Sequence, residues 1–163
     1  MASTTDRIKK RVLLRAKHER VWRALTDVKE FGSWFGVRFD GPFRPGAVVH
    51  GVIVPTTVDP EVAKTQKPYE GARFELTVAQ IEPEKLFSFR WHPFAVGDLD
   101  YSAEPTTLVA FELADVPGGV MLTVTESGFD GIPLERRAKA FAANDWGWGK
   151  QVELIEKYLG QAA

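Results

Sequence analysis

The last part of the chain reads PLERRAKAFAANDWGWGKQVELIEKYLG (residues 133–160), and its apolar residues recur at alternating spacings of four and three. This spacing places them on one stripe of a single long helix. Pro133 suits the first helical position, and Gly160 can serve as the C-cap. The stripe that we expect consists of Leu134, Ala138, Phe141, Asp145, Trp148, Val152, Ile155 and Leu159.

One member of this stripe, Asp145, is a carboxylate among apolar neighbours. An unpaired carboxylate in a sealed interior is costly or takes up a proton. We therefore predict that the helix closes over a cavity which Asp145 faces. The alternative is a carboxylate that pairs with an Arg or Lys, or that reaches solvent at a kink. Gly147 and Gly149 each cost a helix interior about 1 kcal/mol relative to Ala, which indicates close backbone packing or a bend.

Length and composition limit the class of protein. The 163 residues predict one domain spanning 1–163, and the absence of cysteine removes disulfides and thiolate metal ligands. We expect a cytoplasmic location. The 21 basic and 22 acidic residues leave a net charge of -1, so nucleic-acid binding is not expected. No stretch approaches the roughly 20 apolar residues of a membrane span.

The rest of the chain predicts a sheet rather than further long helices. Alternation begins with a strand around Ile8–Ala16, and helical spacing follows in two short segments up to Phe35. A valine-rich strand and two hairpins come next. We expect strands over Ala47–Val54, Gly71–Ile81, Leu86–His92, Thr107–Ala114 and Val120–Ser127, with polar loops over Thr56–Pro68 and Pro93–Thr106.

This order predicts an α+β fold. An antiparallel sheet of about six or seven strands with so little helix cannot be covered on both faces, so it should curl around the C-terminal helix. The two short helices follow the first strand.

Several local strings resemble the START-like, helix-grip superfamily, and within it the family named for the activator of the heat-shock protein 90 ATPase. The strings are ERVWRALT (19–26) leading to Trp34-Phe35, PEKL (83–86) through Trp91, TVTESGF (123–129), and Gly147-Trp148 with Val152, Ile155 and Leu159. The resemblance spans nearly the whole chain. It implies a curved sheet that grips the C-terminal helix, with an apolar cavity between them. Its members bind varied ligands and some catalyse reactions, so the resemblance implies little about activity.

Aromatic residues are the main candidates for a binding site, because ligand pockets are mostly apolar with a few polar groups. We predict a pocket for a small hydrophobic molecule, with no cofactor and no metal. Ordinary core packing is the alternative for each aromatic residue. The predicted ligand-binding residues are Trp34, Phe35, Phe74, Phe89, Trp91, Phe111, Phe141, Asp145 and Trp148.

Two other functions stay open at this stage. The family name suggests an interaction module that acts on a chaperone. The superfamily also includes cyclase and aromatase enzymes, in which case Asp145 or Glu126 would act as general acid or base. The three histidines, His18, His50 and His92, share no metal-ligand spacing and are interpreted as surface or strand residues.

Overall fold

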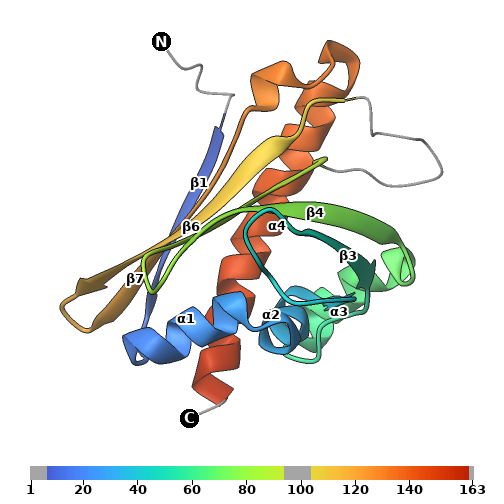
Figure 1. The fold of residues 1–163 in the computed structure, drawn as a ribbon. Helices are drawn as coiled ribbons and strands as arrows, with labels where there is room; N and C mark the ends of the chain where they lie inside the picture. Colours follow the sequence, from blue (N-terminus) through green and yellow to red (C-terminus); the bar gives the residue numbers. More distant parts are fainter. Residues whose placement is uncertain (1–6, 94–103, 162–163) are drawn as a thin grey trace.

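A curved antiparallel sheet wraps around one long helix (Figure 1). The computed structural model describes residues 7–93 and 104–161. The elements are β1 (Arg7–Leu14), α1 (His18–Thr26), α2 (Val28–Phe35), β2 (Val37–Phe39), β3 (Val48–Ile53), α3 (Pro60–Gln66), η1 (Lys67–Tyr69), β4 (Arg73–Glu82), β5 (Leu86–Trp91), β6 (Thr107–Val116), β7 (Gly119–Ser127), η2 (Phe129–Gly131) and α4 (Leu134–Gln161). The predicted fold class, with its two short helices after the first strand, is confirmed.

The seven strands run in the order β1-β7-β6-β5-β4-β3-β2, and every neighbouring pair is antiparallel. Both predicted hairpins are present, with Phe87 opposite Phe111 between them. Alternate residues are buried along β6 and β7, as the period of two of a strand requires. On β7 the buried residues are Val120, Leu122, Val124 and Glu126.

The short helices pack near the C-terminal end of α4 (Figure 1). Asp27 caps α2, since its carboxylate accepts hydrogen bonds from the backbone N–H groups of Lys29 and Glu30. Glu30 then ties three helices together, because it accepts hydrogen bonds from Arg20 (2.5 Å), Arg23 (2.6 Å) and the Tyr158 hydroxyl (2.8 Å). Burial raises the pKa of Glu30, but these donors outweigh it and hold the pKa below its usual value.

The segment after β3 differs from the prediction. A loop is expected over Thr56–Pro68, whereas the structure has α3 and η1 there. Asp59 caps α3 through the N–H groups of Glu61 (2.9 Å) and Val62 (3.3 Å), and Pro60 occupies the first turn. Pro60 in α3 and Pro68 in η1 each lie in the first turn, where a proline is compatible with a helix. The expected loop over Pro93–Thr106 lies mostly outside the described residues.

The long C-terminal helix is confirmed, but the predicted stripe is wrong in its first half. Trp148, Ile155 and Leu159 are buried as expected, whereas Leu134 is 75% exposed and Ala138 is also exposed. Ala140 is the buried residue in this region. The buried face therefore lies about one residue away from the predicted stripe at the start of the helix. No helix within residues 7–93 and 104–161 is long and apolar enough to cross a membrane.

Candidate functional site

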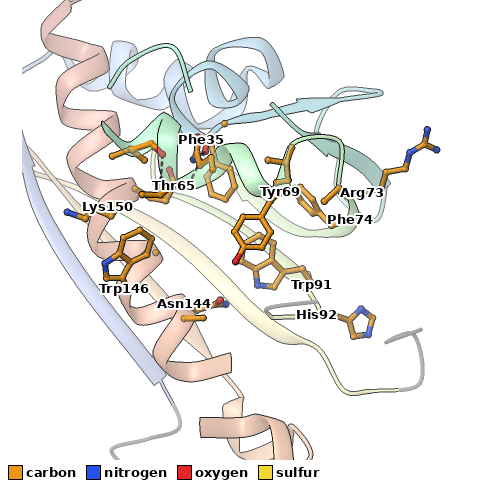
Figure 2. Close-up of a pocket in the computed structure, with 18 residues that line it drawn as sticks. Phe35, Thr65, Tyr69, Arg73, Phe74, Trp91, His92, Asn144, Trp146 and Lys150 are labelled. Atoms are coloured by element: carbon orange, nitrogen blue, oxygen red, sulfur yellow. Dashed lines mark hydrogen bonds between the residues drawn. The ribbon is translucent and has the colours of Figure 1, made fainter. Parts of the chain in front are cut away.

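A cavity of about 420 Å³ lies between α4, α3 with η1, and the β3–β5 part of the sheet. Figure 2 shows Phe35, Tyr69, Phe74 and Trp91 gathered beside it, while Arg73 extends away. Most of the lining is apolar. Its volume is within the range of small-molecule sites. The lining residues also include Ile53, Val62 and Ala143, and the polar residues Thr65, Gln66, His92, Asn144, Lys150 and Gln151.

The α4 wall of this cavity contains a glycine. Gly147 lines the space, and a Cβ atom built there would meet no heavy atom of the described structure within 4 Å. The same holds for Gly149, which does not line the cavity. Close backbone packing, one of the two predicted reasons for these glycines, is therefore wrong. At Gly147 the missing side chain enlarges the cavity.

Two aromatic residues mark where the cavity reaches the surface. Tyr69 at the end of η1 is 46% exposed, and Trp146 on α4 is 54% exposed. Both line the cavity. The ammonium group of Lys150 lies 5.9 Å from the centre of the Trp146 ring, within reach of a cation–π contact. These rings offer flat apolar surface beside the opening.

A fully buried carboxylate lies behind the cavity wall. Glu126 is 0% exposed, and each of its oxygens accepts two hydrogen bonds. Oε1 accepts from Asn144 Nδ2 (2.9 Å) and Trp148 Nε1 (2.8 Å). Oε2 accepts from Trp91 Nε1 (2.7 Å) and Thr107 Oγ1 (2.5 Å). All four donors are neutral, so hydrogen bonds alone stabilise this carboxylate among the described residues.

Glu126 positions the cavity wall rather than forming it. Trp91 and Asn144 line the cavity and donate to Glu126, whereas Glu126 itself does not line it. The carboxylate holds the edge of the Trp91 indole in the core, and the amide of Asn144 is directed inward in the same way. The polar interior position on α4 is therefore Asn144, beside the predicted Asp145.

Asp145 does not face the cavity, so this prediction is wrong. Its side chain is 49% exposed and forms an ion pair of 3.0 Å with Lys10 on β1. One residue on an α-helix corresponds to a rotation of about 100°, which separates Asp145 from the inward direction of Asn144. The alternative of a carboxylate paired with a lysine describes what the structure shows.

The other predicted site residues fall into two groups. Phe35, Phe74 and Trp91 line the cavity. The rest are packed elsewhere: Trp34, Phe89, Phe111 and Trp148 in the buried core, and Phe141 against Phe129 at a ring distance of 5.1 Å. The Trp148 ring lies 5.8 Å from that of Phe111 and 5.9 Å from that of Trp91, so it is a core residue behind the wall.

Several lining residues were not predicted. Tyr69 directly follows the segment that was expected to be a loop, and Asn144 and Gln151 lie just off the expected stripe. A signal for Glu126 was present in the sequence: Val120, Leu122, Val124 and Glu126 alternate, so the carboxylate had to face inward if the first three did. That position predicts buried hydrogen-bond donors opposite it.

The histidines contact backbone or carboxylate oxygens. His18 lies 2.8 Å from Asp115 and also contacts the Glu84 carbonyl, and His50 lies 3.1 Å from Asp40. His92 Nε2 lies 3.0 Å from the Glu104 carbonyl, and this residue lines the cavity. Within the described part of the chain, no group of three or more His, Cys, Asp or Glu residues could hold a metal ion.

Comparison with known proteins gives the family. The family model described as "Activator of Hsp90 ATPase homolog 1-like protein" matches residues 15–160. The chain belongs to this family. The family resemblance inferred from the sequence is thereby confirmed. No curated protein matches the sequence.

Solved structures share the fold of this Hsp90 ATPase activator homolog-like chain. DynU16, encoded in the dynemicin biosynthetic locus, is 25% identical over 96% of this chain with a TM-score of 0.68, and the match covers only 48% of DynU16. MLL2253 from Mesorhizobium loti is 20% identical over 96% of this chain and 98% of its own, with a TM-score of 0.71. The Aha1 dimer from Colwellia psychrerythraea is 16% identical over 94% and 95%, with a TM-score of 0.67.

Proposed function

We propose that this protein binds a small hydrophobic molecule in the cavity between the sheet and α4. The observation that carries the proposal is the cavity itself, at about 420 Å³, with apolar and aromatic side chains over most of its wall. Burial of apolar ligand surface there would contribute roughly 25 cal/mol per Å². Gly147 supports the proposal, because a residue that costs helix stability lies where a side chain would occupy this space.

The comparisons add limited support. DynU16 is encoded in a biosynthetic locus, a setting that suits a protein that handles small organic molecules. The family description also names the activator of an ATPase, which suggests a chaperone as partner. The cytoplasmic location stays a prediction. We propose no reaction, because neither Asp145 nor Glu126 lines the cavity.

A matched pair of variants tests the binding site. Gly147→Leu places a side chain into the cavity, whereas Gly149→Leu adds the same side chain to α4 outside the lining. Each variant and the wild type would be titrated with a panel of hydrophobic fluorescent compounds, including 1-hydroxypyrene, 1-methoxypyrene and a long-chain fatty acid analogue. Circular dichroism would check that both variants fold.

We expect binding by the wild type and by Gly149→Leu. In Gly147→Leu we expect the affinity to fall by at least about tenfold, because the leucine side chain would occupy space that the ligand needs. Equal binding by all three proteins would place the compounds elsewhere and contradict the proposal. A wild type that binds no compound, but accelerates an Hsp90-type ATPase, would favour the co-chaperone interpretation instead.

A further inference from the structure

The charged side chains in the wall of the cavity are both basic. Arg73 on β4 and Lys150 on α4 belong to the lining, and no aspartate or glutamate is among the described residues that line it. The whole chain, in contrast, has 21 basic and 22 acidic residues. Cationic side chains without a carboxylate between them favour a ligand that carries a negative charge.

Lys150 is the cation that can meet such a ligand. Figure 2 shows Arg73 extending away from the cavity, whereas Lys150 and Trp146 lie together on α4. The ammonium group of Lys150 is 5.9 Å from the centre of the Trp146 ring, which is half-exposed at the opening. The Lys150 side chain is itself 41% exposed. Its charge is therefore accessible to the polar end of a ligand that extends past Trp146.

This ammonium group is only loosely paired within the protein. Among the described residues its one ion pair is with Glu153, at 4.0 Å, which is too long for a hydrogen bond. Lys10, in comparison, lies 3.0 Å from the carboxylate of Asp145. Lys150 thus keeps its three N–H donors for water or for a ligand.

The opposite side of the cavity is unsuitable for an anion. Trp91 and Asn144 line the cavity there and donate hydrogen bonds to the buried carboxylate of Glu126 behind them. A second carboxylate on this side would be repelled by Glu126 and would lose its water. An acidic ligand is therefore bound best with its apolar body inside and its charge at the opening.

Building on the proposed function, we propose that the ligand is a hydrophobic acid whose apolar body fills the cavity and whose carboxylate lies at the opening beside Lys150. Apolar burial supplies most of the affinity. Lys150 selects the acid over a basic compound with the same body. Because the ammonium group is partly exposed, this selection is moderate and weakens in high salt.

The experiment compares three probes that share one apolar body and differ in charge. 1-Pyrenebutanoic acid is anionic at pH 7.5, 1-pyrenebutylamine is cationic, and 1-pyrenebutanol is neutral and reports apolar binding alone. Each would be titrated by its fluorescence in about 100 mM and about 500 mM NaCl. At the lower salt concentration we expect the acid to bind the wild type about fivefold more tightly than the amine, with a smaller ratio at the higher concentration.

Variants of two lysines assign this preference. Lys150→Gln removes the charge and Lys150→Glu reverses it, and both new residues favour a helix, so the variants should fold. Lys85→Glu is the matched control, because Lys85 is exposed in the turn between β4 and β5 and does not line the cavity. The acid and the amine should bind Lys150→Gln about equally. Lys150→Glu should prefer the amine, and Lys85→Glu should keep the wild-type preference.

The neutral probe separates this inference from the function on which it rests. If the wild type binds the alcohol but binds the acid no better than the amine, the acid preference is overturned and hydrophobic binding stands. An acid preference that persists in both Lys150 variants would overturn the role of this residue. If none of the three probes binds the wild type, the proposed function fails and the inference fails with it.

Discussion

The indole N–H of Trp91 donates a hydrogen bond of 2.7 Å to the carboxylate of Glu126, and this contact joins the cavity wall to the buried core. Trp91 lies on β5 and Glu126 on β7, with β6 between them in the sheet. The same carboxylate accepts from Trp148 and Asn144 on α4. Glu126 therefore links the sheet to the helix at the side of the cavity that α4 covers.

Replacing Glu126 with glutamine should destabilise the fold. The amide NH₂ group would take the place of one oxygen and face donors that need an acceptor, and the Trp91 or Trp148 N–H would lose its partner. We expect a loss on the order of 2–4 kcal/mol in the free energy of unfolding, measured by urea denaturation. Glu112→Gln, at an exposed position of neighbouring β6, should change it by less than about 0.5 kcal/mol. If Glu126→Gln leaves the free energy of unfolding unchanged, the four hydrogen bonds of Glu126 contribute little to stability.

Substitution of Gly147 or of Gly149 by alanine should have the same effect on stability but different effects on ligand binding. Gly147→Ala and Gly149→Ala should each raise the free energy of unfolding by about 1 kcal/mol, since neither Cβ atom meets a neighbour and alanine favours a helix. Only Gly147→Ala should weaken binding of aromatic compounds. Destabilisation by either alanine would mean that the backbone there needs glycine.

The ion pair between Lys10 and Asp145 should contribute little to the free energy of unfolding. Asp145→Asn removes a surface contact whose partners are 29% and 49% exposed, so we expect a change of less than about 1 kcal/mol that shrinks further in high salt. Binding of the aromatic panel should be unchanged. An Asp145→Asn variant that folds but no longer binds these compounds would show that Asp145 contributes to the binding site, and would contradict the structure.

His18 should make stability depend on pH near neutrality. The hydrogen bond to Asp115 and the one to the Glu84 carbonyl raise the pKa of His18 above its ordinary value of about 6.5. Because the folded state holds this proton more tightly, the stabilisation is fully present below pH 6.5 and is lost as the pH rises through the raised pKa. The contribution should be under about 1 kcal/mol for so exposed a pair.

Thermal unfolding across pH 5.5 to 8.5 would measure this effect, with His18→Gln as the comparison. The difference in stability between the wild type and the variant should shrink as pH increases over this range. A difference that grows with pH would contradict the raised pKa.

The sequence predicts the fold better than the site, and particular residues explain why. Alternation along β7 and the long helix over residues 134–161 follow from local periodicity, which needs no knowledge of partners. The direction in which Asp145 points depends on a rotation of one residue, and Lys10 on β1 lies far from it in sequence. The Asn144 contact with Glu126 is equally long-range. Such pairings are fixed by tertiary packing.

The α3 segment illustrates the same limit for loops. Asp59 followed by Pro60 is a helix start, but the prolines before and after it favour a loop when counted alone. The turn that α3 and η1 make places Tyr69 and Gln66 in the cavity wall. Because this segment was predicted as a loop, these two residues of the cavity wall were not predicted.

A crystal structure of the protein with the tightest-binding aromatic compound of the panel tests the central claim most directly. We predict electron density for the compound in the cavity beside Gly147, with Tyr69 and Trp146 flanking its entrance. Density on another surface, or a cavity closed by its own side chains in the complex, would contradict the account.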